Sequence, residues 1–271
     1  MLFNRYIRQL HDMLMKKIPY AFFFCLLIFS SCRRPFQKKP VFEPELILKS
    51  IDNRDNYINY YLKLSNDFIA YDTAYNLITK VEFLKALSSG KYLPIWLKSD
   101  DSLLYYKLYK LGPNVDRRFT LGFKQIGEMC YENYKREGKK FPQFNYIDLN
   151  GHVYNNKIVK GKILVIDCWF VACGSCVAGM PQLNKIAHQY KNRDDILFIS
   201  LDNDQKFNAV HFLKTTRFDF AVIPLPDDYF TNILKVNTYP STFIINKRGF
   251  ISKIVTNPEE LLTALKKEIA K

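Results

Sequence analysis

Residues 162–176 read KILVIDCWFVACGSC, and this stretch places Cys173 and Cys176 just after an uninterrupted apolar run. Its segment 163–166 predicts a strand buried on both faces, because it shows no alternation with polar residues. Beyond Cys176 the apolar residues recur at helical spacing, which predicts a helix that begins at the cysteine pair. A Cys-x-x-Cys pair at a strand-to-helix junction therefore organises this part of the chain.

The two cysteines of the pair occupy chemically different positions. Cys173 lies where unpaired backbone N–H groups and the helix dipole stabilise negative charge, which lowers the pKa of a thiol from ~8.5 towards ~7 or below. Cys176 lies deeper in the helix and can attack a mixed disulfide that Cys173 has formed. Gly174 and Ser175 between them leave the approach to the sulfur atoms uncrowded. The pattern predicts thiol–disulfide exchange.

Other uses of a cysteine pair fit the sequence less well. A structural zinc site needs about four ligands, but His152, His188 and His211 show no spacing that would complete one. Haem attachment requires a histidine directly after the second cysteine, where this chain has Val177. We therefore expect no metal and no cofactor. An inert structural disulfide stays open as an alternative in an oxidising compartment.

Several residues on both sides of the cysteine pair add to this pattern. Asp167 lies six residues before Cys173 and Trp169 four before it, while Pro181 follows Cys176 by five. A later loop reads Thr238-Tyr239-Pro240-Ser241-Thr242-Phe243. With these features, residues 139–271 resemble the thioredoxin-like superfamily, and most of all the TlpA-like, membrane-tethered redoxins of bacterial envelopes, which are thiol–disulfide oxidoreductases.

The resemblance implies an α/β fold with a central mixed sheet flanked by helices. It implies that Cys173 attacks substrate disulfides, that Cys176 resolves the mixed disulfide, and that Asp167 accepts the Cys176 proton, as a buried acid near a thiol can. It also implies a cis Pro240 facing the pair, although unaided X-Pro bonds are cis only ~5–6% of the time. The other expected substrate-groove residues are Trp169, Gly174, Ser175 and Tyr239.

Two positions near the pair depart from the family pattern or add to it. Ala172 stands where a tryptophan is frequent, so a substrate-contact surface is expected to differ. Cys168 is a third nearby thiol, but side chains of adjacent strand residues point to opposite faces, so we expect it in the core.

The secondary-structure elements expected in the rest of residues 139–271 are a hairpin at 144–154, a strand at 196–201, a helix near 205–215, an insertion with a helix at 216–236, a hairpin at 242–255 and a helix from Asn257 to Lys271.

Residues 45–138 lie outside the resemblance and carry no catalytic motif, so their function stays open. We expect a small, helix-rich α+β domain, with Cys130 in its core. This segment holds 11 of the 18 tyrosines, which are expected to pack with their hydroxyls at the rim, although a tyrosine-rich surface can also bind a partner. The first expected helix is capped by Asp52 and carries Tyr57, Tyr60, Tyr61, Leu64 and Phe68. A second helix begins with a capping box of Thr79 and Glu82 and ends before Gly90. The remaining expected elements are a strand at 92–97, a strand or helix at 105–111 and a helix at 120–136.

Residues 1–32 have the pattern of an export signal. Lys16 and Lys17 precede an apolar run of about a dozen residues, too short for the ~20 that a bilayer-spanning helix needs. The small pair before Cys32 resembles a bacterial lipobox, which implies cleavage before Cys32 and a lipid on that cysteine. An ordinary cleaved signal and an N-terminal anchor helix are the alternatives. The basic, proline-rich residues 33–44 predict a tether.

The formal charge of +14 first suggests a nucleic-acid ligand. Residues 1–32 account for +3 of it, and the rest divides into +5 over residues 33–138 and +6 over residues 139–271. No cationic block and no nucleic-acid motif accompany this charge. We therefore expect no nucleic-acid partner.

The sequence as a whole predicts an exported, lipid-anchored thiol–disulfide oxidoreductase that faces the periplasm. Its expected partners are envelope proteins with thiols or disulfides, the membrane, and an upstream electron donor. Reduction is the favoured direction. Two alternatives remain: a peroxiredoxin-type peroxide reductase, and a scaffold lipoprotein whose thioredoxin-like half is redox-silent.

Overall fold

The computed structural model of the chain describes residues 38–143 and 145–271. Residues Lys39–Lys271 form one compact unit. The expected export signal and Cys32 lie outside the described residues. In the part of the chain that the structure does describe, no helix has both the length and the apolar character to cross a bilayer.

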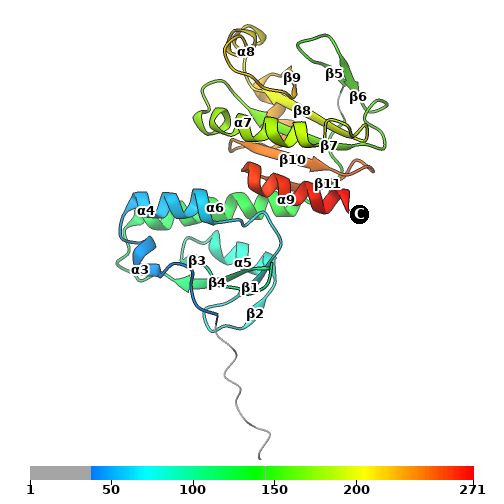
Figure 1. Cartoon of the computed structure of the whole chain (residues 1–271). Coiled ribbons are helices and arrows are strands. Elements are labelled where there is room, and N and C mark those ends of the chain that lie inside the picture. The colour runs from blue at the N-terminus through cyan, green and yellow to red at the C-terminus, as the bar shows by residue number, and fades with distance from the viewer. Residues whose placement is uncertain (1–37, 144) are drawn as a thin grey trace, which may run out of the picture. The chain divides into compact units, whose positions relative to one another are not determined.

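The second half of the chain is built on a mixed five-stranded sheet with strand order β11-β10-β7-β8-β9 (Figure 1). Strands β7, β8 and β9 are parallel to one another, whereas β10 runs antiparallel to both β7 and β11. Every residue of β7 is buried, as its unbroken apolar run predicts. The strands are β7 (Ile163–Trp169), β8 (Ile196–Asp202), β9 (Ala221–Pro224), β10 (Ser241–Ile245) and β11 (Ile251–Val255).

Helices cover both faces of this sheet, which confirms the predicted α/β class. One face packs against α7 (Gly174–Gln189) and α9 (Pro258–Ile269) through a cluster that includes Val165 and Leu261. The other face packs against a π-helical turn, Tyr229–Leu234. A helix α8 (Lys206–Leu213) and a small hairpin of β5 (Asn145–Ile147) and β6 (Val153–Asn155) complete this half.

The first half has a sheet and a core of its own. Its four strands have the order β2-β1-β4-β3, with β1 parallel to β4 and the other pairs antiparallel. The side chains of Phe83, Tyr106 and Phe123 are fully buried in this core. The elements are α3 (Pro44–Ile47), α4 (Ile51–Asn56), β1 (Phe68–Tyr71), β2 (Leu77–Ile78), α5 (Lys80–Leu87), β3 (Tyr92–Trp96), β4 (Leu104–Lys110) and α6 (Arg117–Arg136).

Local end signals predict two of these helices well. The Thr79 hydroxyl accepts a hydrogen bond from the Glu82 N–H, and the Glu82 carboxylate accepts one from the Thr79 N–H, which is the predicted capping box of α5. Gly90 follows that helix with a φ of 72°, a left-handed conformation that glycine adopts without strain. The predicted helix at 120–136 is α6, which begins at Arg117.

The predicted helix from Asp52 to Phe68 is wrong in its cap and in its length. Ser50, not Asp52, caps α4, because its hydroxyl accepts the Asn53 N–H at 3.1 Å. The helix then passes into a π-helical turn, Tyr57–Tyr61. Phe68 begins strand β1 instead, where its ring packs against Phe83 and Tyr106. Apolar spacing alone could not separate this helix from the strand, because pairing with β4 decides the conformation.

Two further expectations need correction. The insertion at 216–236 contains strand β9, which pairs in parallel with β8. Within the expected tether at 33–44, the described residues Pro40 and Val41 already take part in the fold, since Pro40 forms a bridge with Leu97 and the Val41 N–H donates to the Trp96 carbonyl at 2.8 Å. The ambiguous segment at 105–111 is strand β4.

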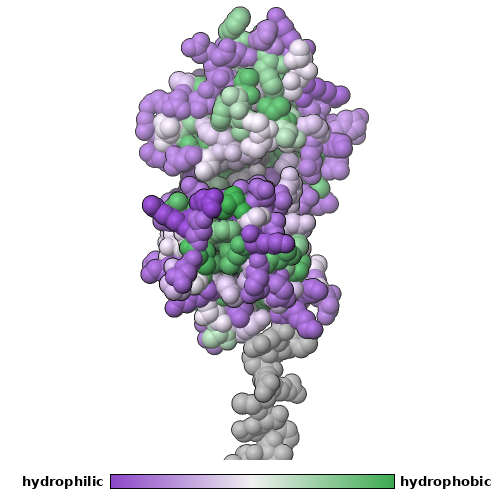
Figure 2. Space-filling view, turned by 90° about the vertical axis from the view of Figure 1, so that its left-hand side faces the viewer, coloured by the Kyte–Doolittle hydropathy of each residue, from purple (hydrophilic) through white to green (hydrophobic). Residues whose placement is uncertain are grey.

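Hydrophilic side chains cover most of the molecular face in Figure 2, with apolar groups exposed between them. Several large apolar side chains are more than half exposed, including Leu77 at 71% and Phe207 at 77%. Single exposed apolar residues of this kind are ordinary on protein surfaces. The individual exposures of these residues therefore do not by themselves indicate a binding site.

Helices α5 and α6 meet at a glycine, which gives a test of the first half. A Cβ at Gly127 of α6 would lie 2.6 Å from the Ser88 nitrogen and 2.7 Å from the Leu87 carbonyl carbon. A Gly→Ala substitution inside a helix normally raises the free energy of unfolding by up to about 1 kcal/mol. At Gly127 we instead expect alanine to lower it by about 1–3 kcal/mol through overpacking. Urea denaturation of the oxidised protein measures the change.

The matched control for this substitution is Gly112→Ala. A Cβ at Gly112 meets no atom within 4 Å, and the residue is exposed. We expect its unfolding midpoint to stay at the wild-type value. A Gly127→Ala variant as stable as Gly112→Ala would contradict the close packing of α5 on α6.

Candidate functional site

The cysteine pair lies where strand β7 gives way to helix α7. Cys173 is the N-cap of α7, and its Sγ accepts a hydrogen bond from the Cys176 N–H at 3.2 Å. The two sulfur atoms are joined as a disulfide, and the Ser175 hydroxyl lies 3.5 Å from the Cys173 Sγ. Both cysteines are nearly buried, with exposures of 6% and 3%. A Cys173 thiolate at this place would be stabilised by the helix N-terminus.

Asp167 is buried in strand β7, two residues before Trp169. Its Oδ1 accepts a hydrogen bond from the Thr242 hydroxyl at 2.7 Å. Burial raises the pKa of the Asp167 carboxyl to about 7, and the bond from Thr242 opposes that rise. The carboxyl can therefore take up and release a proton near neutral pH, which is what a proton acceptor for a thiol requires.

The loop before β10 brings Pro240 to the same place. The Tyr239–Pro240 peptide bond is cis. In the pairing of β10 with β7, Thr242 lies opposite Asp167, so the loop is held beside the acid. The Ser241 hydroxyl closes the loop by donating to the Thr238 carbonyl at 2.8 Å. The Tyr239 ring packs edge-on against Phe170, with the ring centroids 5.2 Å apart.

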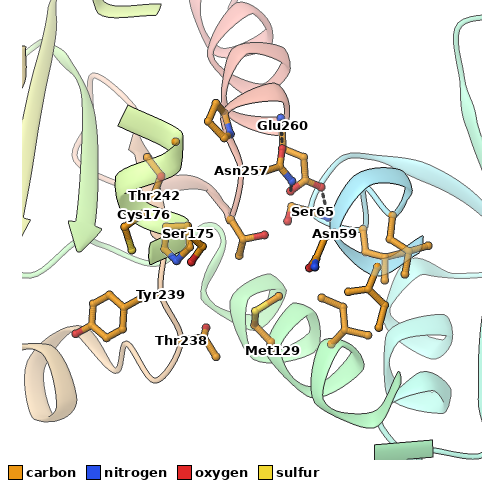
Figure 3. A pocket seen from close by; sticks show the side chains of 18 of the residues that line it. Asn59, Ser65, Met129, Ser175, Cys176, Thr238, Tyr239, Thr242, Asn257 and Glu260 are labelled. Carbon is orange, nitrogen blue, oxygen red and sulfur yellow. Dashed lines mark hydrogen bonds between the residues drawn. The ribbon is translucent and has the colours of Figure 1, made fainter. Parts of the chain in front are cut away.

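One cavity of about 600 Å³ connects these elements (Figure 3). Of the predicted site residues, Asp167, Ser175, Cys176, Tyr239 and Pro240 line it. Cys173, Gly174 and Trp169 are not among the described residues that line it. The cavity therefore meets Cys176 and the buried carboxyl of Asp167 together.

Trp169 packs beside the pair and is fully buried. Its indole N–H donates to the Ser200 hydroxyl at 3.2 Å, and its ring centroid lies 5.5 Å from that of Phe212. It belongs to one apolar cluster with Cys173 and Cys176. This arrangement favours packing beside the site over a direct place in the substrate groove.

The two remaining described cysteines are free and buried. Cys168 packs with Ile166 and Phe243 on the sheet face away from the pair, and burial raises its thiol pKa well above the ordinary value. Cys130 lies on α6, where burial raises its pKa to about 12. Neither thiol has the lowered pKa of a reactive cysteine.

Nothing in the sequence indicated that the first half contributes to the site. Asn59 from the π-helical turn and Met129 from α6 line the same cavity as Cys176 (Figure 3). Their segments show only helical spacing, which is typical of packing. A second buried acid was also missed: Asp202, at the end of β8 and opposite Trp169, has its pKa raised to about 7 by burial and by the charge of Asp204.

Comparisons with known proteins assign the second half of the chain to a protein family. The family model described as Redoxin matches residues 136–267. The thiol-disulfide oxidoreductase ResA of Bacillus thuringiensis subsp. konkukian (strain 97-27) is 32% identical over 134 residues, which cover 46% of this chain and 75% of that protein. The chain belongs to the redoxin family. It is a thioredoxin-like thiol–disulfide oxidoreductase.

A second relative and a solved structure are similar to the same half of the chain. The ResA protein of Geobacillus kaustophilus (strain HTA426) is 28% identical to this redoxin over 138 residues, which cover 48% of the chain and 79% of the relative. A solved thiol:disulfide interchange protein from Bacteroides sp. is 19% identical, with a TM-score of 0.44 over 50% of this chain and 91% of its own. The family match begins at residue 136, so it leaves most of the first half of this redoxin unmatched.

The raised pKa of Asp167 predicts a pH dependence of stability. The folded carboxyl titrates near 7 and an unfolded aspartate near 3.9, so ionisation between these values favours the unfolded chain. Stability is therefore highest below the unfolded pKa and is lost as pH rises through the folded pKa. We expect wild type to lose roughly 2–4 kcal/mol more than Asp167→Asn between pH 4 and pH 8.

Urea denaturation of both proteins in the oxidised form, at a series of pH values, measures this difference. Asn is a suitable replacement because its carbonyl can still accept the Thr242 hydroxyl while carrying no titrating proton. A stability difference between the two proteins that does not change with pH would contradict a raised pKa at Asp167.

Proposed function

We propose that this redoxin exchanges disulfides with protein substrates of the bacterial cell envelope and acts as a reductase. The observation that carries the proposal is the meeting of Cys176, Asp167 and cis Pro240 around one cavity, with Cys173 at the helix N-terminus beside it. An inert disulfide has no need of a buried acid that titrates near neutral pH. The names of the relatives favour exchange over peroxide reduction.

The reaction begins at Cys173. Its thiolate attacks one sulfur of a substrate disulfide, so that a Cys173–substrate bond forms while the substrate S–S bond breaks and the leaving sulfur takes up a proton. Cys176 then gives its proton to Asp167 and attacks the Cys173 Sγ. The second substrate sulfur leaves and takes the proton back from Asp167 as it becomes a thiol, and two electrons have passed from the pair to the substrate. The pair ends as a disulfide, which is the state of the structure.

The direction of this exchange depends on partners. A dithiol donor upstream must return two electrons to the Cys173–Cys176 disulfide before the next cycle. Run in reverse, the same steps would oxidise substrate thiols. We assign Cys32 as the site of the lipid anchor that holds this redoxin at the envelope membrane, facing the periplasm, and no nucleic acid takes part.

The resolving role of Cys176 can be tested by trapping. In Cys176→Ser the mixed disulfide on Cys173 cannot be resolved, so we expect disulfide-linked complexes with envelope proteins to accumulate in cells. Non-reducing gel electrophoresis followed by mass spectrometry detects and identifies them. The control is Cys173→Ser, which lacks the attacking thiol and should form none of these complexes.

Two outcomes of the trapping experiment would contradict the proposal. One is the absence of complexes from Cys176→Ser. The other is disulfide exchange by Cys173→Ser at the wild-type rate in an assay with excess dithiol. Identification of the proteins trapped on Cys173 would also give the substrate and the direction of exchange.

The anchor can be tested separately through Cys32→Ser. We expect this variant to leave the membrane fraction for the soluble fraction, because a single amino-acid change removes the lipid attachment site, and stable anchoring requires the acyl chains. Metabolic labelling with a radioactive fatty acid should mark wild type only. Cys25→Ser, inside the apolar run, is the control and should stay in the membrane fraction; a labelled Cys32→Ser protein would show that the anchor lies elsewhere.

A further inference from the structure

We propose that the first half of this redoxin is the substrate-selecting wall of the active-site cavity, and that the cavity receives an uncharged, extended polypeptide segment around the substrate cysteine. The inference rests on the proposed function, because it names the substrate class of that same site. It concerns residues for which neither the family match nor the sequence motifs supply a role.

The wall is formed by two elements of the first half. Ile58 and Asn59 come from the π-helical turn Tyr57–Tyr61, and Ile126 and Met129 come from one face of α6. Figure 3 shows Asn59 and Met129 on one side of the cavity and Cys176, Ser175 and Tyr239 on the other. A substrate that reaches the pair through this cavity therefore contacts both halves.

The position of the wall is fixed by buried contacts. The Glu260 carboxylate, on the first turn of α9, accepts the Ser65 N–H at 3.1 Å and the Asn257 side-chain amide at 3.0 Å. Glu260 is 2% exposed. Just after α6, the Gly138 N–H donates to the Ile251 carbonyl at 2.8 Å, which joins the end of the helix to strand β11. The wall is thus attached to the redox half at two places, one near each of its two elements.

The lining of the cavity has a distinctive charge pattern. The chain contains 40 Lys and Arg residues, yet none of the described residues that line the cavity is Lys, Arg or His. Among those same described residues, the only carboxyl groups belong to the buried Asp167 and Glu260. A carboxylate on a ligand would find no cation there, and moving it out of water without a partner is costly.

The remaining lining suits a polypeptide backbone. Asn59, Ser175, Thr238, Thr256 and Asn257 offer neutral polar side chains or backbone groups, of the type that pairs with peptide N–H and C=O groups. The apolar side chains of the wall can contact uncharged side chains next to the substrate cysteine. The volume of about 600 Å³ lies within the range of ~300–1,000 Å³ that is usual for ligand sites. Small anionic disulfides such as glutathione disulfide do not fit this chemistry.

A charge placed on the wall tests the proposal. The full-length protein and its variants reduce four substrates in turn: a peptide disulfide with uncharged flanks, the same peptide with acidic flanks, glutathione disulfide, and the small neutral hydroxyethyl disulfide. In wild type we expect kcat/KM for the uncharged peptide to exceed that for the acidic one, and for glutathione disulfide, by tenfold or more. In Met129→Arg we expect kcat/KM for the uncharged peptide to fall about tenfold and that for the acidic peptide to rise, because the new cation pairs with its carboxylates.

Two further proteins keep this test specific. Gln125→Arg puts the same charge on an exposed position of α6 that does not line the cavity, and it should behave as wild type on every substrate. Asn59→Ala alters an exposed side chain, so it should fold, and it should lower kcat/KM for the uncharged peptide about threefold or more. The rate of each variant with hydroxyethyl disulfide is the reference for its peptide kcat/KM, so that a loss of peptide contacts is separated from a general loss of exchange, and in Gln125→Arg that rate should stay within about twofold of wild type.

The outcomes separate the two proposals. Wild-type kcat/KM on both peptides in Met129→Arg and Asn59→Ala would overturn the role of the wall while leaving disulfide exchange intact. Equal turnover of glutathione disulfide and the uncharged peptide by wild type would overturn the uncharged substrate class. A wild-type protein that reduces none of these disulfides, hydroxyethyl disulfide included, would instead contradict the proposed function.

Discussion

The pairing of β10 with β7 is the constraint on which the rest of the site depends. Its antiparallel register places Ser241 opposite Cys168 and Thr242 opposite Asp167. A slip of one residue would turn every side chain of β10 to the other face of the sheet and remove the Thr242 hydroxyl from the Asp167 carboxyl. The loop that contains cis Pro240 leads directly into this strand, so the same register also sets where that loop meets the cysteine pair.

The same strand separates the thiols by their surroundings. Asp167 and Cys168 are neighbours in β7, but their side chains point to opposite faces, and Cys168 packs among apolar residues that include Ile166 and Phe243. Burial there raises its thiol pKa well above the ordinary value. Cys173 instead caps a helix, where N–H groups and the helix dipole favour a thiolate. Position in the fold, and not the number of cysteines, decides which sulfur atoms can react.

Much of the second half could be predicted from the sequence, because its signals are local or belong to a known family pattern. The Asn257-Pro258 start of α9 and the unbroken apolar run of β7 each depend on a few neighbouring residues, and so does the capping box of α5 in the first half. Strand β9 was missed because Ala221–Pro224 is four residues long and is a strand only through its pairing with β8. Phe68 was misassigned for a similar reason, since its helical spacing loses to the parallel pairing of β1 with β4.

The cavity wall could not be predicted at all, because it depends on contacts between residues far apart in the chain, such as Ser65 and Glu260. Glu260 makes two kinds of contact. It bonds with the cap residue Asn257 in the first turn of α9, and its carboxylate accepts a backbone N–H from the first half of the chain. The ion pairs between the halves are weaker restraints where they are exposed, as with Lys63 and Glu259. Because the bond from the Ser65 N–H to Glu260 is buried, water and salt compete with it far less than with surface pairs. The distance between the wall and Cys176 is therefore set by hydrogen bonds in the interior, which is the condition for a wall that selects substrates by shape and charge.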